Sequence, residues 1–260
     1  MPLRGQLREA LQRHRALILL SDLDGTLAPI RDRPQDARLP PGTRRALARL
    51  ARHPRVRMGF LSGRSLRDLR RRIGLRSAVY AGSHGLEITC RTAHFRHPRA
   101  VAAAGLLRRI SRELARRTAR LGGVVVERKS LAVAVHFRAA DRAAVPRLRA
   151  IVREVTWRAP TLEVLAGKKA LEVRPRVGWG KGEAVGFLRS VLAKSLGRAS
   201  FVTLYLGDDE TDEAAFRALR GKAFCVQVGR RRSRASHRLR GPAAVGDLLA
   251  WLTDELAVLG

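Results

Sequence analysis

Acidic side chains occur in pairs at two places in the sequence, each directly after an apolar segment. Asp22 and Asp24 form the first pair, and Asp208 and Asp209 form the second. Residues two apart on a strand point the same way, so Asp22 and Asp24 would present both carboxylates to one side. A carboxylate cluster is costly unless a cation neutralises it, and hard oxygen ligands suit Mg²⁺. If the two apolar segments are neighbouring strands, the sequence predicts a Mg²⁺ site.

Each acidic pair also has a plainer explanation. Asp24 with Gly25 could be an ordinary turn. The acidic residues between Asp209 and Glu213 could complement the dipole at the start of a helix. Two independent accidents of this kind explain the sequence less economically than one shared site.

Two further segments carry groups that suit a phosphate. Ser62 and Gly63 precede a helical pattern, so they offer a hydroxyl and exposed backbone N–H groups, although an ordinary helix cap explains Ser62 equally well. Lys181 is one of six lysines in a chain with 47 arginines, which suggests that a compact ammonium is needed there. A solvated loop residue is the alternative. The segment around Lys181 lacks the spacing of a P-loop or of a dinucleotide-binding turn.

Apolar segments alternate with Arg-rich helical patterns in the first and last thirds of the chain. We expect strands at 16–20, 56–61, 77–81, 201–206 and 224–228, and helices at 43–53, 65–73, 182–196, 213–219 and 247–259. Strands that are apolar throughout indicate a parallel sheet with both faces covered. The predicted fold class is therefore α/β, with a doubly wound, Rossmann-like parallel sheet.

The middle of the chain has a different pattern, in which a helix precedes a pair of short strands twice. The expected helices span 100–121 and 141–157, and the expected strands span 124–127, 131–137, 161–165 and 170–173. Short consecutive strands indicate an antiparallel sheet. We therefore predict a core formed by 1–99 and 174–260, interrupted by a smaller inserted α/β domain at 100–173.

Chemically active residues follow four of the predicted core strands. The segments are Asp22-Leu23-Asp24-Gly25-Thr26, Ser62-Gly63-Arg64, Gly82-Ser83-His84-Gly85 and Gly207-Asp208-Asp209-Glu210-Thr211-Asp212-Glu213. Ligands of open parallel sheets bind outside the carboxyl ends of the strands. We therefore expect these four segments to form one site.

The charge of the chain is unusual, because 53 Lys and Arg face 22 Asp and Glu for a formal net charge of +31. Such a protein attracts polyanions without a dedicated site, since counterion release alone drives the binding. The arginines are spread along the whole chain and aromatic residues are only 5%, which favours solvated surfaces over specific nucleic-acid recognition. A basic nucleic-acid-binding protein on an inactive scaffold remains the distant alternative.

Other whole-chain features limit the environment. No stretch of about 18 residues lacks charge, so we expect no membrane-spanning helix. Cys90 and Cys225 cannot form a disulfide framework, which favours a cytoplasmic location. We expect a monomer that binds nucleic acid only non-specifically.

Together, the motifs resemble a known superfamily. Asp22-Leu23-Asp24-Gly25-Thr26-Leu27, Ser62-Gly63-Arg64, Lys181 and Gly207-Asp208-Asp209 are similar to the four ordered motifs of haloacid dehalogenase-like phosphatases. More narrowly, Gly82-Ser83-His84-Gly85, Glu127-Arg128-Lys129, Leu171-Glu172-Val173-Arg174-Pro175 and the 207–213 string resemble the trehalose-6-phosphate phosphatases. The resemblance covers nearly the whole chain. It departs at Ser130, where glycine is expected, and in the arginine run 230–234.

The resemblance implies an activity and a set of catalytic roles. The activity is Mg²⁺-dependent hydrolysis of trehalose 6-phosphate to trehalose and phosphate, the last step of trehalose biosynthesis. Asp22 would be the nucleophile that forms an aspartyl-phosphate. Asp24 would protonate the leaving sugar oxygen and then deprotonate water. Mg²⁺ would be held by Asp22, the Asp24 carbonyl and Asp208, with support from Asp209 or Asp212.

The remaining implied roles concern the substrate, a small sugar phosphate. Ser62, Gly63 and Lys181 would bind the phosphate, with Lys181 counted also as catalytic. The inserted domain would be a cap, and the residues assigned to substrate binding are Arg64, Ser83, His84, Glu127, Lys129 and Glu172. Sucrose 6-phosphate and mannosyl phosphoglycerate remain alternative substrates, and a phosphotransferase or mutase remains an alternative reaction.

Overall fold

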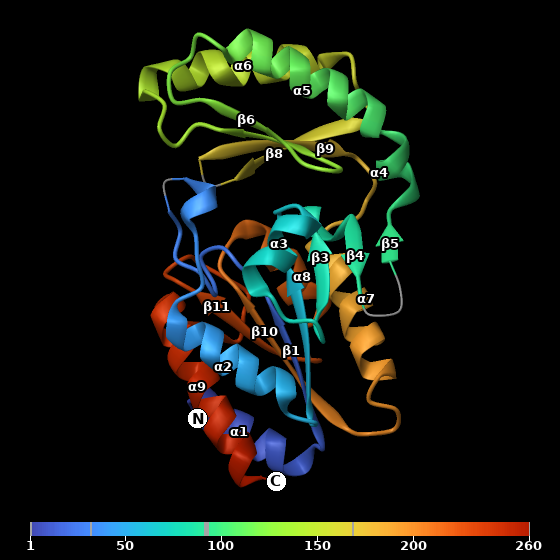
Figure 1. The fold of residues 1–260 in the computed structure, drawn as a ribbon, viewed down its shortest axis with the longest axis vertical. Coiled ribbons are helices and arrows are strands. Elements are labelled where there is room, and N and C mark those ends of the chain that lie inside the picture. The colour runs from blue at the N-terminus through green and yellow to red at the C-terminus, as the bar shows by residue number, and fades with distance from the viewer. Residues whose placement is uncertain (1, 32, 91–93, 168, 260) are drawn as a thin grey trace. The chain divides into compact units, whose positions relative to one another are not determined.

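A computed structural model of the protein describes residues 2–31, 33–90, 94–167 and 169–259 (Figure 1). The chain divides into two compact units. Unit 1 comprises Met1–His94 and Trp179–Gly260, and unit 2 comprises Phe95–Gly178. Unit 2 is therefore a few residues longer at each end than the inserted segment expected from the sequence.

The larger sheet is parallel over most of its width. Its strands are β1 (Ala16–Ser21), β2 (Val56–Leu61), β3 (Val79–Gly82), β4 (Glu87–Thr89), β5 (His94–Arg96), β10 (Phe201–Gly207), β11 (Phe224–Val228) and β12 (His237–Leu239). Their order among the described residues is β12-β11-β10-β1-β2-β3-β4-β5. Pairing is parallel from β12 to β3, and β4 runs antiparallel to β3. The predicted α/β class is confirmed.

Helices cover both faces of this sheet (Figure 1). They are α1 (Leu3–Arg13), α2 (Pro41–Arg52), α3 (Leu66–Ile73), α7 (Lys181–Lys194), α8 (Glu210–Ala218) and α9 (Pro242–Val258). Side chains of α1, α2, α3 and α9 share one buried cluster with Leu17 and Leu19 of β1. The neighbouring Leu20 points to the other face, where a Cβ on Gly59 would meet both Leu20 and Leu188 of α7. Gly59 therefore lets α7 approach the sheet closely.

Helices α1, α8 and α9 differ most from the sequence expectation. Helix α9 begins at Pro242, five residues before the predicted 247, with a proline in its first turn. The prediction did not include α1, whose only buried side chains are Leu7 and Leu11 in an otherwise Arg-rich segment. Helix α8 begins three residues before the predicted 213, at Glu210. It does so because the Asp209 side chain accepts hydrogen bonds from the backbone N–H groups of the first turn.

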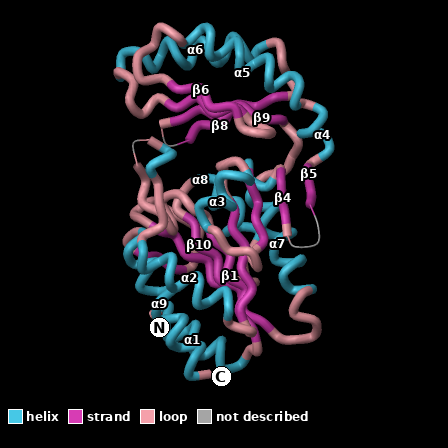
Figure 2. The backbone as a smooth tube through the Cα atoms, in the orientation of Figure 1, coloured by secondary structure: helices cyan, strands magenta, loops and turns pink. Residues whose placement is uncertain are grey.

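Unit 2 is a small antiparallel sheet with helices on one face (Figure 2). Its elements are α4 (Pro98–Ala102), α5 (Ala104–Thr118), β6 (Val125–Arg128), β7 (Val133–His136), α6 (Val145–Trp157), β8 (Leu162–Gly167) and β9 (Ala170–Pro175). The strand order is β6-β7-β9-β8, and all pairings are antiparallel. Leu107 of α5 and Leu148 of α6 pack against Val133 and Val173 in a separate core. The single helix expected at 100–121 is replaced by the two helices α4 and α5.

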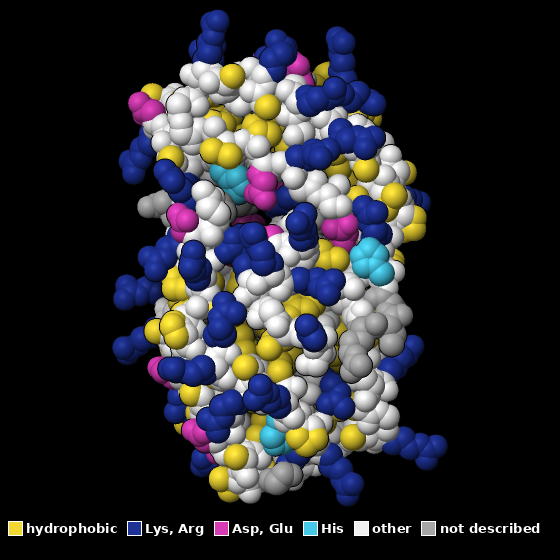
Figure 3. Space-filling model, in the orientation of Figure 1, with side chains coloured by type: hydrophobic (Ala, Val, Ile, Leu, Met, Phe, Trp, Pro, Cys, Tyr) yellow, Lys and Arg dark blue, Asp and Glu magenta, His cyan; other side chains and the backbone are white. Residues whose placement is uncertain are grey.

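Positive side chains are scattered over the visible face of both units (Figure 3). This distribution matches the spread of arginine along the sequence. Among the helices in the described part of the chain, none combines the length and apolar character needed to cross a bilayer.

Candidate active site

Neighbouring strands bring acidic residues from distant parts of the chain to one edge of the larger sheet. Asp22 follows β1 and Asp208 follows β10, and the two strands pair with Ser21 opposite Leu206. Oxygen atoms of Asp22, Asp208 and Asp212 all lie within 4.8 Å of one another. All three residues are buried, and Asp212 is fully inaccessible to solvent.

The Lys181 ammonium lies among these carboxylates. Lys181 is the first residue of α7, and its Nζ donates to Asp22 Oδ1 at 3.0 Å and to Asp212 Oδ1 at 2.9 Å. The same atom is 3.8 Å from Asp209 Oδ1. Burial alone would lower the pKa of Lys181, but the negative charges of Asp212 and Asp22 raise it well above its usual value. Lys181 is therefore a fixed cation.

The Lys181 ammonium by itself does not balance the acidic groups around it. Burial raises the pKa of Asp22 well above its usual value, and the charges of Asp212 and Asp208 add to the rise although Lys181 opposes it. Lys181 lies within 4 Å of the carboxylates of Asp22, Asp209 and Asp212, and Asp208 lies beside Asp22 and Asp212. A second positive charge would favour the ionised form of Asp22.

The local backbone leaves room for the Asp208 carboxylate beside Gly25. Gly25 has φ +85°, and a Cβ at this position would lie 2.1 Å from Asp208 Oδ2. Any other residue would therefore clash with that carboxylate as well as strain the backbone. The donors gathered here are oxygens, which suit a hard divalent cation such as Mg²⁺ rather than a softer metal. The residues present fit the implied metal.

Asp212 accepts hydrogen bonds from four groups of the cluster, and one of the donors, Tyr205, could not be inferred from the motifs. Its Oδ2 accepts from the backbone N–H groups of Asp208 at 3.0 Å and Asp209 at 3.1 Å. Its Oδ1 accepts from Lys181 and, at 2.5 Å, from the hydroxyl of Tyr205. Tyr205 is buried within β10, and burial together with the charge of Asp212 raises its pKa well above the usual value. The Tyr205 hydroxyl therefore remains a donor.

The turns after β2 and β3 are joined to each other. The backbone N–H of His84 donates to the Ser62 carbonyl at 3.0 Å. Ser83 and His84 both have positive φ, 48° and 55°, which is a strained conformation for side chains of their size. A Cβ on Gly63 would lie 2.7 Å from His84 Nε2, so any side chain at position 63 would displace the His84 ring. Four residues with predicted phosphate or substrate roles thus lie together.

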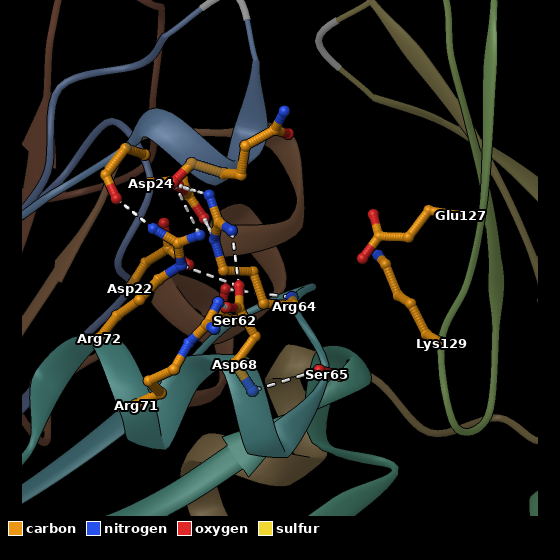
Figure 4. Close-up of polar contacts among 12 residues, drawn as sticks. Asp22, Asp24, Ser62, Arg64, Ser65, Asp68, Arg71, Arg72, Glu127 and Lys129 are labelled. Atoms are coloured by element: carbon orange, nitrogen blue, oxygen red, sulfur yellow. Dashed lines mark hydrogen bonds and ion pairs between the residues drawn. The ribbon is translucent and has the colours of Figure 1, made fainter.

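Arg64 has two acidic partners in unit 1 (Figure 4). Its Nε and Nη2 donate to the two carboxylate oxygens of Asp24 at 2.6 and 2.7 Å. Its Nη1 donates to Asp68 Oδ2 at 2.7 Å. The family resemblance implies a substrate role for Arg64 and does not single out Asp68, which lies in the first turn of α3. Within unit 1, Arg64 thus connects Asp24 to Asp68, and its substrate role stays a prediction.

The predicted substrate residues of unit 2 form their own group. Glu127 on β6 and Glu172 on β9 both lie opposite Ala134 of the intervening strand β7. Lys129 Nζ contacts Glu172 Oε2 at 2.5 Å, and the ends of the Glu127 and Lys129 side chains point toward each other (Figure 4). Glu127 also lies 2.8 Å from His136 Nε2. Unit 2 therefore presents two carboxylates in one row of its sheet, with the Lys129 ammonium in contact with Glu172.

Solved structures show which fold the chain has. A haloacid dehalogenase-like hydrolase from Bacteroides thetaiotaomicron is similar with a TM-score of 0.61 over 91% of this chain and 99% of that chain, at 14% sequence identity. The trehalose-6-phosphate phosphatase C-terminal domain from C. albicans is similar with a TM-score of 0.81 over 97% of each chain, at 24% identity. The chain has the haloacid dehalogenase-like fold.

Sequence comparison narrows this class to one family. The sequence model of the trehalose-phosphatase family matches residues 20–243, and the chain belongs to that family. A trehalose-phosphate phosphatase from Mycobacterium tuberculosis is 39% identical over 242 residues, which cover 91% of this chain and 60% of the relative. The chain thus spans about three fifths of the length of this relative. The resemblance stated from the motifs is confirmed.

Proposed function

We propose that the protein is a Mg²⁺-dependent phosphatase that hydrolyses trehalose 6-phosphate to trehalose and phosphate. The observation that carries the proposal is the contact of Lys181 with Asp22 and Asp212 beside Asp208, in a chain of the trehalose-phosphatase family. Transfer of a phosphoryl group depends mainly on positioning and on neutralising charge. A carboxylate nucleophile beside an ammonium and a metal site meets both needs.

The first step transfers the phosphoryl group to Asp22. A carboxylate oxygen of Asp22 forms a bond to phosphorus while the bond from phosphorus to the sugar oxygen breaks. The electron pair of that bond goes to the sugar oxygen, which takes a proton from the carboxyl group of Asp24. Lys181 offsets the repulsion between the anionic nucleophile and the anionic ester, and Ser62 and Gly63 hold phosphoryl oxygens.

The second step returns the enzyme to its starting state. Water attacks the phosphorus of the aspartyl-phosphate, and Asp24, now ionised, accepts a proton from that water. The bond between phosphorus and the Asp22 oxygen breaks, which releases phosphate and the free carboxylate. Using Asp22 as the nucleophile divides one difficult displacement into two easier ones.

The metal and unit 2 have separate tasks in this proposal. Asp22, the Asp24 carbonyl and Asp208 hold Mg²⁺, with support from Asp209 and Asp212, and the bound ion supplies positive charge for the phosphoryl oxygens. Unit 2 is the cap, and Glu127, Lys129 and Glu172 bind the hydroxyls of the disaccharide. Ser83 and His84 also contact the substrate. Charged donors and acceptors make strong hydrogen bonds to hydroxyls, so they suit this role.

A phosphate-release assay on purified protein tests the proposal. We expect release from trehalose 6-phosphate in the presence of Mg²⁺, and loss of release when EDTA is added. Sucrose 6-phosphate and mannosyl phosphoglycerate serve as comparison substrates. Preferred hydrolysis of one of these would overturn the assignment of trehalose 6-phosphate as the substrate. Release of phosphate without Mg²⁺ would overturn the assignment of the metal. Transfer of the phosphate to another sugar would identify a phosphotransferase or mutase.

A further inference from the structure

We propose that Asp68 is a positioning residue for the reaction, which acts by holding Arg64 so that Arg64 in turn holds the Asp24 carboxyl group in place. The inference rests on the proposed function, because it takes Asp24 to be the group that exchanges protons with the leaving oxygen. Asp68 itself would touch neither the substrate nor the metal. Figure 4 shows the three residues in contact.

The geometry of Arg64 fixes the direction in which Asp24 can point. The Nε and Nη2 edge of the guanidinium binds both oxygens of Asp24 side by side, at 2.6 and 2.7 Å. Paired parallel bonds of this type set orientation as well as distance. The Arg64 side chain is 12% exposed, so solvent screens the pair only weakly. Asp24 therefore cannot rotate without breaking two charged hydrogen bonds.

Asp68 supplies the other support of the same guanidinium. Its Oδ2 accepts from Arg64 Nη1 at 2.7 Å and from Arg72 Nε at 2.8 Å, and its Oδ1 accepts from Arg71 Nη2 at 2.8 Å. Burial opposes ionisation, but hydrogen bonds from Arg72, Arg64 and Arg71 lower the pKa of Asp68 to about 2. Asp68 thus separates three guanidinium groups that would otherwise repel one another.

The backbone around Asp68 is itself fixed. The Asp68 N–H donates to Ser65 Oγ at the start of α3. Arg72, on the next turn, donates to the Ala37 carbonyl and, at 3.3 Å, to the Gln35 carbonyl, which ties the helix to the segment after β1. Asp68 can therefore serve as a rigid anchor for a side chain that must stay in one orientation.

The main chain of Arg64 is held independently of Asp68. The Arg64 N–H donates to Ser62 Oγ at 3.2 Å, and the Arg64 carbonyl accepts from the Ser83 N–H at 2.7 Å. Loss of Asp68 would therefore leave the turn and the paired bonds to Asp24 in place but remove the support on the other edge of the guanidinium. Arg64 and Arg72 share one oxygen of Asp68, so without that carboxylate they would repel each other, and the guanidinium would shift together with the Asp24 side chain bound to it. Misplacement of a reacting group by about 1 Å can cost about 10²-fold in rate.

Two substrates with different leaving groups separate this role from a general structural one. A sugar oxygen needs a proton as its bond to phosphorus breaks, whereas nitrophenolate leaves without one. We expect Asp68→Asn to lower kcat/KM for trehalose 6-phosphate by about 10- to 100-fold, which is part of the roughly 10²- to 10⁴-fold that general acid catalysis contributes. For p-nitrophenyl phosphate we expect a loss of less than about threefold, because kcat/KM covers only the steps through transfer to Asp22.

Three comparison variants complete the experiment. Asp24→Asn should show the same discrimination between the two esters, with a larger loss on the sugar ester. Asp68→Glu, which keeps the charge, should recover part of the lost kcat/KM. Arg71→Gln removes the partner of Asp68 whose side chain is 76% exposed, and it should leave both esters unchanged. Circular dichroism and thermal unfolding establish that each variant is folded.

The outcomes distinguish failure of this inference from failure of the proposed function. If folded Asp68→Asn loses activity equally on both esters, or loses none, Asp68 does not position Asp24. If Asp68→Asn does not fold, Asp68→Glu is the deciding variant, because its longer side chain shifts the carboxylate that binds Arg64. A loss of activity confined to the sugar ester supports the inference. An equal loss on both esters overturns it. If Asp24→Asn itself fails to discriminate, the role proposed for Asp24 is wrong, and this inference falls with it.

Discussion

Lys181 Nζ lies 3.0 Å from Asp22 Oδ1, although 159 residues separate the two along the chain. The contact joins the start of α7 to the end of β1, and both side chains are buried. Burial of a charged ammonium is unfavourable unless it is paired, and the adjacent carboxylates provide the pairing. The pair therefore links the stability of the core to the proposed chemistry.

Replacing Lys181 should damage both properties. We expect Lys181→Met to lower kcat by about 10²- to 10³-fold, the cost of losing one group that stabilises transition-state charge. In the absence of Mg²⁺ it should also lower the free energy of unfolding by about 3–5 kcal/mol, because it leaves buried carboxylates unpaired. Lys194→Met, at the exposed end of the same helix, is the control and should change activity little. Equal effects of both substitutions would contradict the assignment.

Tyr205 should matter to activity through its hydroxyl alone. Tyr205→Phe keeps the ring that packs against Phe216 but removes the hydrogen bond to Asp212. We expect about 1 kcal/mol less stability and a severalfold lower kcat, since Asp212 also holds Lys181. Tyr80→Phe is a matched control, because Tyr80 donates to the Leu75 carbonyl away from the acidic cluster. It should lose similar stability in a urea titration but keep its kcat.

Gly25 should be required for the metal rather than for the fold. In Gly25→Ala the new methyl group would overlap Asp208 Oδ2 and add the strain of positive φ, which is about 1–2 kcal/mol. We expect much weaker activation by Mg²⁺. Gly74→Ala, at φ +75° with no atom near the new Cβ, carries only the backbone strain. Mg²⁺ titrations of activity should therefore separate the two variants, and parallel curves would refute the clash.

Stabilisation by Mg²⁺ should increase with pH. The pKa of Asp22 is raised in the folded state, so the folded protein holds a proton that the unfolded chain has lost above about pH 4. Without metal, this group makes stability fall as pH rises through that window, whereas the lowered pKa of Asp209 acts only below about pH 4. Mg²⁺ competes with the proton on Asp22. The gain in Tm on adding Mg²⁺ should be larger at about pH 8 than at about pH 5, and a gain independent of pH would count against the site.

Sequence reasoning found the residues whose position follows from strand ends. Asp22 and Asp208 stand directly after apolar strands, and Lys181 stands out as a rare lysine before a helix. Tyr205 could not be found this way, because within an apolar strand a tyrosine indicates packing and not a hydrogen bond to a carboxylate seven residues later. The structure shows that its partner is Asp212, because α8 packs against β10.

The role of Asp68 could not be predicted from the sequence for a different reason. It lies in an Arg-rich helix, where a single acidic residue normally indicates a solvated face. Only the fold shows that Arg64, four residues earlier, turns one edge toward Asp24 and the other toward Asp68. The short strands β4, β5 and β12 were missed because each has only three residues, too few for a periodic pattern.

Reductive trapping of the intermediate tests the role of Asp22 most directly. Borohydride reduces an acyl phosphate to an alcohol, so quenching the enzyme during turnover of trehalose 6-phosphate should convert Asp22 to homoserine, detectable by mass spectrometry of the peptide around position 22. Asp22→Asn should show neither the conversion nor phosphate release. Turnover with an unmodified Asp22, or undiminished release by Asp22→Asn, would contradict the covalent mechanism.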